Sequence, residues 1–195
     1  YTVVGYQQIQ GDQYAALYSE TLTVELENDF LPFLYPNQYV NFSPDSGASK
    51  LALSMVSEDT ADVDALKQIY NYVVNNLTYD YDKAQTVETG YLPDVDETLS
   101  TKTGICFDYA ALTTAMLRSC DIPCKLQIGY TGDIKHAWID VYIRSKGWVT
   151  GAVSFKGDSW SLMDPTFDSS ADSDDSEAIQ DYIGNADNYT VQFTR

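Results

Sequence analysis

Residues 103–112 read TGICFDYAAL and open a segment with helical spacing in this chain of 195 residues. Apolar residues recur at steps of three and four, which predicts a helix over residues 106–120 with one buried stripe. The stripe consists of Tyr109, Leu112, Met116 and Cys120. Thr103 and Gly104 occupy the positions where an N-cap and a tight turn belong, so they predict the start of the helix.

Cys106 lies at this predicted helix start and not on the apolar stripe. The unpaired N–H groups and the positive end of the helix dipole stabilise a thiolate at such a position. The backbone N–H of Cys106 could also receive an oxyanion. Taken alone, a cysteine at a helix start is more often structural than functional, so the interpretation needs partner residues.

His136 is the only histidine of the chain and begins the string HAW, residues 136–138. Residues 136–143 alternate with period two, which predicts a strand with His136 and Trp138 on one face. A lone histidine on a strand is usually a packed or surface residue. If the chain is a thiol enzyme, however, no other residue can be its histidine base.

Asp164 ends a short strand predicted over residues 160–164 and precedes a proline. Taken alone, it is more commonly a turn-capping aspartate. After Cys106 and His136 in the sequence, it supplies the group that orients the base of a thiolate nucleophile. All three residues fall at the edges of predicted elements, where active-site residues tend to lie. The sequence therefore predicts a catalytic triad.

This triad places a condition on the sheet. In a plain meander the strands that carry His136 and Asp164 would run parallel, which would put the two side chains at opposite ends of the sheet. For the two to meet, residues 160–164 must pair directly and antiparallel with residues 136–143. Residues 147–157 must then form a detour or a hairpin arm, because an intervening strand there would rule out the triad.

Other patterns add elements around this core. A second apolar stripe predicts a helix over residues 62–77. The weaker patterns predict strands over residues 1–6, 21–26, 39–42, 125–130 and a short helix over residues 178–183. No internal repeat is present, and the length fits one domain.

Composition limits the classes of partner. With 29 acidic and 11 basic residues the chain has a net charge of −18, so its surface repels phosphate backbones and anionic membranes. We therefore expect no nucleic acid as a partner, and no stretch approaches the ~18 apolar residues of a membrane helix. The charge serves solubility first, with attraction of cationic peptides as the alternative. The 16 tyrosines suit grooves as well as cores.

The cysteines and the acidic runs do not predict a metal site. Cys120 and Cys124 flank three residues, and we interpret them as two small half-buried thiols, with a disulfide as the alternative. Structural zinc needs four Cys or His ligands at another spacing. The acidic runs at residues 94–97 and 172–177 lack the spacing and the central glycine of a calcium loop. We expect no metal and no cofactor.

Four blocks, in order, resemble the core of the transglutaminase-like superfamily. They are residues 103–112 (TGICFDYAAL), 116–123 (MLRSCDIP), 136–141 (HAWIDV) and 163–166 (MDPT). The resemblance covers roughly residues 62–168 and includes bacterial transglutaminase-like domain proteins. Cys120 and Asp121 depart from the family pattern, because small residues, often glycine, are usual at that turn.

The resemblance implies an α+β, papain-like fold in which a nucleophile-bearing helix packs on an antiparallel sheet. It implies that Cys106 attacks an acyl carbon, His136 shuttles the proton and Asp164 orients His136. The backbone N–H of Cys106 would be one oxyanion donor, and the second donor stays unassigned. Trp138 and Tyr109 are candidates for a substrate groove, with core filling as the alternative.

The implied function is acyl transfer or hydrolysis at peptide or protein amide bonds through a thioester. Hydrolysis by a cysteine peptidase or amidase is somewhat favoured over cross-linking. The alternative is a catalytically silent module that binds peptides or cell-surface polymers. We expect residues 51–195 to form the catalytic core and residues 1–50 to add accessory strands and loops. Since the chain begins at Tyr1 and is acidic and tyrosine-rich, we expect an extracellular or cell-surface protein.

Overall fold

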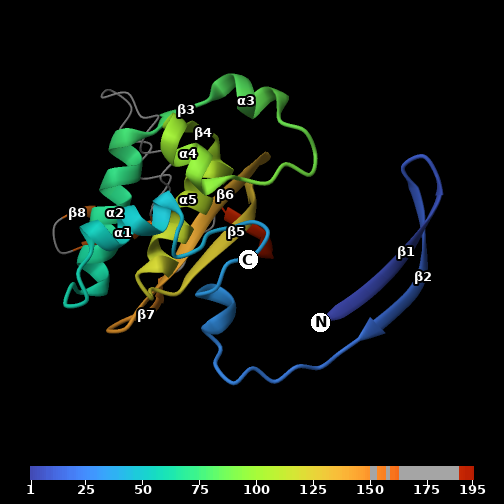
Figure 1. The fold of residues 1–195 in the computed structure, drawn as a ribbon, viewed down its shortest axis with the longest axis horizontal. Helices are drawn as coiled ribbons and strands as arrows, with labels where there is room; N and C mark the ends of the chain where they lie inside the picture. The colour runs from blue at the N-terminus through green and yellow to red at the C-terminus, as the bar shows by residue number, and fades with distance from the viewer. Residues whose placement is uncertain (150–152, 157–158, 163–188) are drawn as a thin grey trace.

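Helices cover a four-stranded antiparallel sheet in the computed structural model, which describes residues 1–149, 153–156, 159–162 and 189–195 (Figure 1). The helices are α1 (Gly47–Met55), α2 (Asp62–Asn76), α3 (Tyr81–Thr86), α4 (Val95–Thr101) and α5 (Cys106–Ser119), with a 3-10 helix η1 at Leu31–Phe33. The strands are β1 (Thr2–Gln10), β2 (Gln13–Thr21), β3 (Thr78–Tyr79), β4 (Thr103–Gly104), β5 (Cys124–Thr131), β6 (Ile134–Ile143), β7 (Gly147–Val149), β8 (Val153–Lys156), β9 (Ser159–Leu162) and β10 (Tyr189–Thr194). The predicted α+β class is confirmed.

The main sheet has the strand order β10-β5-β6-β7, and each neighbouring pair is antiparallel. β5 and β6 form a hairpin whose turn contains Gly132 at φ 58°, a left-handed conformation that favours glycine. Gly129 of β5 has no room for a side chain, because a Cβ there would lie 1.9 Å from the carbonyl oxygen of Thr190 in β10. The strands predicted over residues 125–130 and 136–143 are therefore confirmed, and β10 packs tightly beside them.

α5 is the central helix of the body. It contacts α1, α2 and α4 as well as β5 and β6, so helices and sheet enclose it (Figure 1). Its spacing predicted one buried stripe, but residues 108–118 are all buried. Ala110, Ala111 and Ala115 leave room for neighbours to approach on the sides that the stripe does not cover. The predicted helix is confirmed, and its burial is more complete than its periodicity indicates.

A carboxylate of α5 itself holds the start of this helix. Ile105 is the N-cap, and its N–H donates to Oδ2 of Asp108 at 2.8 Å. The predicted cap and turn at Thr103 and Gly104 are wrong, because these two residues are extended and pair in parallel with β3. Gly104 has another role, because its lack of a side chain makes room for Asp108. A Cβ at Gly104 would lie 2.6 Å from the Cβ of Asp108.

Arg118, in the last turn of α5, ties three other segments together. Its Nε and Nη2 donate to the carbonyl oxygen of Cys124 at 3.0 and 2.7 Å. Nη1 donates to the carbonyl oxygen of Tyr35 at 2.7 Å, and Nη2 also donates to that of Arg195 at 3.0 Å. Burial lowers the pKa of Arg118, and these carbonyl oxygens offset the cost of enclosing its charge. The guanidinium thereby fixes the edge of the main sheet against α5.

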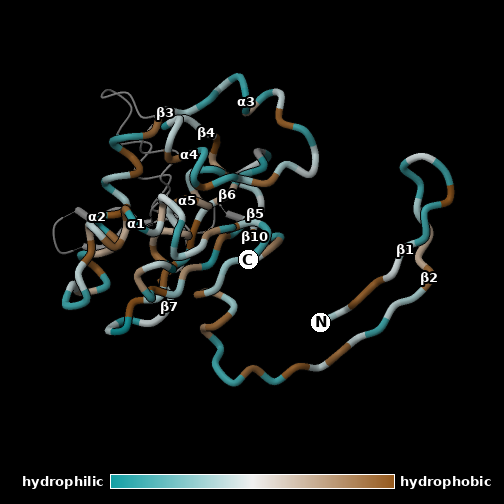
Figure 2. Tube along the Cα trace, viewed as in Figure 1, coloured by the Kyte–Doolittle hydropathy of each residue, from teal (hydrophilic) through white to brown (hydrophobic). Residues whose placement is uncertain are grey.

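A separate hairpin of β1 and β2 stands away from the sheet (Figure 1). The strand predicted over residues 1–6 is confirmed. The strands predicted over residues 21–26 and 39–42 are wrong, because β2 ends where the first begins and only an isolated bridge touches the second. Alternating apolar residues form a strand only where a neighbour accepts their hydrogen bonds. Figure 2 shows apolar residues along both the hairpin and the connecting segment.

β9 pairs with β8 in a hairpin and not with β6. The predicted direct pairing of residues 160–164 with β6 is therefore wrong for residues 160–162. Two residues separate β8 from β9, and strands so close in sequence pair readily with each other. β7 pairs only with residues 141–143, at the end of β6 away from His136. The helix predicted over residues 178–183 lies outside the described residues.

Candidate active site

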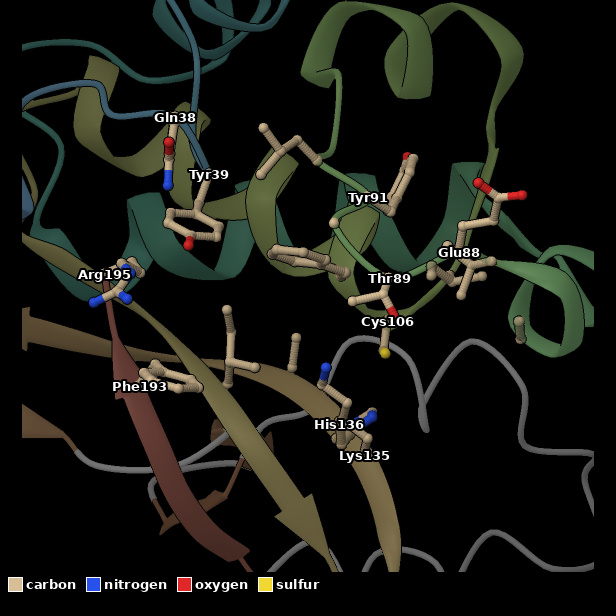
Figure 3. Close-up of a pocket in the computed structure, with 18 of the residues that line it drawn as sticks. Gln38, Tyr39, Glu88, Thr89, Tyr91, Cys106, Lys135, His136, Phe193 and Arg195 are labelled. Carbon is tan, nitrogen blue, oxygen red and sulfur yellow. The ribbon is translucent and has the colours of Figure 1, made fainter. Parts of the chain in front are cut away.

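A cavity of about 850 Å³ lies between the first turn of α5, the start of β6 and the segment that joins α3 to α4 (Figure 3). Aromatic rings make up much of its wall. The rings belong to Tyr39, Tyr79, Tyr91, Phe107 and Phe193. A concave, largely apolar site of this size is typical of ligand binding.

Cys106 and His136 both line this cavity. Cys106 is the first residue of α5, its thiol is free and partly exposed, and Figure 3 shows its sulfur directed toward the strand that carries His136. His136 is 5% exposed, and its ring stacks with that of Trp138 at a centroid distance of 6.4 Å. The structure thus brings the predicted nucleophile and the predicted base to one site.

Asp164, the third member of the predicted triad, lies outside the described residues. Its contact with the His136 ring therefore stays a prediction. β7 covers only the last residues of β6, so among the described strands none pairs with the first half of β6 on that side. One half of the condition therefore holds in the described residues, because no strand intervenes beside His136. The other half does not, because residues 160–162 pair with β8 and not with β6.

Trp138 and Tyr109, the predicted groove residues, are buried in the interior instead. They are 1% and 0% exposed, and neither lines the cavity. Tyr109 is enclosed because α5 is covered on all sides. Trp138 packs under β5, where its ring lies within 3.0 Å of the position that a Cβ on Gly129 would occupy. Both side chains fill the core, which is the alternative that the sequence left open, and segments that precede α5 supply most of the cavity wall.

A charged cluster next to Cys106 joins the cavity wall to α5. The carboxylate of Asp108 is fully buried and accepts from Nζ of Lys83 at 2.8 Å and from the hydroxyl of Tyr91 at 2.5 Å. The Lys83 ammonium also donates to the Tyr91 hydroxyl at 2.7 Å and lies 4.4 Å from that ring's centroid. Because Tyr91 lines the cavity, the cluster links the wall to the helix that carries the nucleophile.

Tyr91 and Lys83 both stay protonated at neutral pH. Burial raises the pKa of Tyr91 to about 12, and its hydrogen bond to Asp108 acts in the same direction. Burial by itself lowers the pKa of Lys83, but hydrogen bonds to Asp108 and Tyr91 outweigh it and raise that pKa. Of the three residues, only Asp108 had a local signal, its place three residues after the N-cap. Lys83 and Tyr91 come from segments that no local pattern connects with α5.

The two remaining thiols have raised pKa values, which disfavours their thiolate forms. Cys120 and Cys124 are free, as the sequence favoured, and burial raises their pKa values to about 11 and about 12. Within the described ranges, no three Cys, His, Asp or Glu side chains gather closely enough to hold a metal ion. None of the helices described here is both long and apolar enough to cross a bilayer.

The family model described as the transglutaminase-like superfamily matches residues 49–165. Among curated proteins, the chain is 26% identical over 154 residues to the uncharacterized protein YebA of Bacillus subtilis. The matched region is 67% of this chain and 21% of YebA. It is 24% identical over 136 residues to the kyphoscoliosis peptidase of Mus musculus, covering 64% of this chain and 18% of the peptidase. The UPF0252 protein MJ1282 of Methanocaldococcus jannaschii is 40% identical over 62 residues, 29% of this chain and 18% of that protein. The chain spans about a fifth of the length of these relatives.

Solved structures share the fold. A candidate cysteine protease from Cytophaga hutchinsonii matches with a TM-score of 0.56 at 20% identity, covering 88% of this chain and 48% of that chain. The periplasmic domain of TgpA from Pseudomonas aeruginosa, bound to ethylmercury, matches with a TM-score of 0.51 at 18% identity. The match covers 73% of this chain and 50% of that domain's chain. At these identities the likeness concerns the fold alone, and the chain spans about half of each neighbour.

Proposed function

The chain belongs to the transglutaminase-like superfamily, and on this basis we propose that it is a thiol enzyme that cleaves amide bonds of peptides or proteins. Cys106 acts as the nucleophile, His136 as the base and Asp164 as the residue that orients His136. The observation that carries the proposal is the shared cavity: the thiol at the first turn of α5 and the imidazole on β6 both line it. The first N–H groups of a helix have no intrahelical partner and favour a thiolate.

The proposed reaction has two stages. Cys106 transfers its proton to His136, and its sulfur attacks the carbonyl carbon to form a C–S bond and an oxyanion, which accepts from the Cys106 N–H. The C–N bond then breaks, His136 returns the proton to the leaving amine, and a thioester remains. A water molecule then gives a proton to His136 and forms a C–O bond with the thioester carbon. The C–S bond breaks, the acid leaves, and His136 returns the proton to the Cys106 sulfur.

Hydrolysis is favoured over transfer to an amine. The curated relative named a peptidase and the structural neighbour described as a candidate cysteine protease both support cleavage of peptide bonds. The chemistry of the two outcomes differs only in whether water or an amine reaches the thioester. The alternative, a silent cavity that only binds peptides, predicts an ordinary thiol at Cys106.

Labelling with iodoacetamide, followed by mass spectrometry, separates these possibilities. At neutral pH we expect Cys106 to be alkylated much faster than a free thiol such as glutathione, because His136 takes its proton. Cys120 and Cys124 are internal controls, because their burial keeps them protonated. His136→Gln should abolish the fast labelling of Cys106. A labelling rate at Cys106 that matches a free thiol and is the same in wild type and His136→Gln contradicts an enzyme.

Turnover of casein tests whether water or an amine accepts the acyl group, and whether Asp164 takes part. We expect peptide release to exceed incorporation of a fluorescent amine, and the reverse result would identify a transferase. Asp164→Asn should lower kcat by roughly two to four orders of magnitude, because the His136 ring loses its orientation. Asp168→Asn removes an equal charge four residues further along the sequence and serves as the matched control. Equal kcat values in the two variants would exclude Asp164 from the triad.

A further inference from the structure

Arg195 brings a guanidinium into the wall of the cavity, well apart from Cys106 (Figure 3). Its Cζ lies 5.0 Å from the ring centroid of Tyr39 and 5.3 Å from that of Phe193. Cation–π contacts with these two rings restrict the motion of the guanidinium. The cavity therefore has an aromatic end that presents a positive charge.

The backbone of Arg195 is held as firmly as its side chain. Its N–H donates to the carbonyl oxygen of Leu126 at 2.8 Å, and its carbonyl oxygen accepts from the Leu126 N–H at 2.7 Å. The buried Arg118 donates to the same carbonyl oxygen at 3.0 Å. A cation placed in this way loses little conformational entropy when it binds a ligand, which favours affinity.

No carboxylate compensates this charge in the part of the chain that the structure describes. The Arg195 guanidinium donates to the carbonyl oxygen of Thr194 at 3.2 Å, and the described ion pairs use other cations. The only acid in the described lining is Glu88, which is exposed. Among the described residues, the Arg195 guanidinium therefore faces the cavity beside aromatic rings and carbonyl oxygens but no acid.

We infer that Arg195 binds a carboxylate of the substrate, so that preferred peptides carry one acidic group at a fixed distance from the scissile amide. The inference rests on the proposed function, since the same cavity contains Cys106. A guanidinium offers paired N–H groups that match the two oxygens of a carboxylate. The net charge of −18 repels acidic runs, so the fit is to a single carboxylate in an otherwise apolar or basic peptide.

Binding to the Cys106→Ala variant of the full chain tests the inference without any bond cleavage. The probes are dye-labelled pentapeptides of alanine, leucine and phenylalanine in which each position in turn is Glu or Gln. A second set compares a free C-terminal carboxylate with a C-terminal amide. Affinities are measured by fluorescence anisotropy in this background and after a further change: Arg195→Gln, Arg195→Lys, Lys135→Gln or Lys67→Gln.

We expect the carboxylate peptide to bind about tenfold more tightly than its neutral partner at one position. Arg195→Gln should abolish this ratio, and Arg195→Lys should keep part of it. Lys67→Gln, which removes the same charge from an exposed position on α2, should leave the affinity ratio unchanged. A preference within the first set identifies an acidic side chain, and one within the second a C-terminal carboxylate.

Three results overturn the inference: no carboxylate preference in either set, a preference that survives Arg195→Gln, or a preference that depends on Lys135 instead. Lys135 lines the same cavity beside His136, so its variant separates the two cations (Figure 3). Because the binding assay uses a chain without the nucleophile, its outcome is independent of the alkylation experiment. Failure of the proposed enzyme and failure of the carboxylate site are therefore distinguishable.

Discussion

Asp108→Asn removes the negative charge that joins the cavity wall to α5. The carboxylate is 0% exposed and accepts three hydrogen bonds, from Lys83, Tyr91 and the backbone N–H of Ile105. An asparagine has almost the same shape. Its oxygen can still accept from Lys83 and Ile105, while its amide N–H groups donate to the Tyr91 hydroxyl. The substitution therefore keeps the contacts and removes the charge that strengthens them.

The expected cost follows from these three contacts. A hydrogen bond to a charged group contributes about 1.5–3 kcal/mol, and a neutral one about 0.5–1.5 kcal/mol. A loss of about 1 kcal/mol at each contact gives roughly 3 kcal/mol in total. Because the Lys83 side chain is 31% exposed, solvent screens part of its attraction, and we expect the free energy of unfolding to fall by about 2–3 kcal/mol.

Urea denaturation followed by tryptophan fluorescence measures this loss. With a slope of about 2 kcal/mol/M, the unfolding midpoint should fall by about 1–1.5 M. Asp45→Asn is the matched control, because its carboxylate is 99% exposed and lies 3.6 Å from Lys50. That change should cost less than about 0.5 kcal/mol. A midpoint for Asp108→Asn as close to wild type as that of the control would refute the reasoning.

Two further changes test the packing around α5 and α2. Arg144 donates to the carboxylate of Asp62 from Nη2 at 2.6 Å and from its backbone N–H at 2.8 Å, and these bonds hold the pKa of Asp62 below its ordinary 3.8. Because the folded state has the lower pKa, this stabilisation is complete above about pH 4 and is lost as the pH falls through the folded value. In the Asp62→Asn variant the urea midpoint should therefore depend less on pH below about pH 4 than it does in wild type. An unchanged pH dependence would show that the Asp62–Arg144 pair does not stabilise the fold. Leu112→Ala, at a position that is 0% exposed in α5, should cost about 2–5 kcal/mol. Leu53→Ala, at a position that is 56% exposed on α1, is the control, and equal urea midpoints in the two variants would show that α5 is not the centre of the core.

Local patterns predicted the elements that build the site. The helices at residues 62–77 and 106–120 and the strands at 125–130 and 136–143 were predictable, because the spacing of apolar residues reports which face of an element is buried. The strands predicted over residues 21–26 and 39–42 are wrong because the same signal has a limit. An alternating pattern shows which face could be buried but not whether a partner strand is present.

The sequence alone settles which residues can carry the chemistry. It places Cys106 at the first turn of a helix, it offers one histidine, and its blocks resemble one superfamily. These properties depend on residue type and on near neighbours, so a reader of the chain can find them.

Only the tertiary structure decides what surrounds those residues. It encloses Tyr109 and Trp138, brings Lys83 and Tyr91 to Asp108, and adds a guanidinium from the C-terminal end to the cavity. Contacts between distant segments form when the packing free energy of the whole chain exceeds the entropy lost in closing the loops between them. That balance is a sum over many residues, and no local pattern in the sequence contains it.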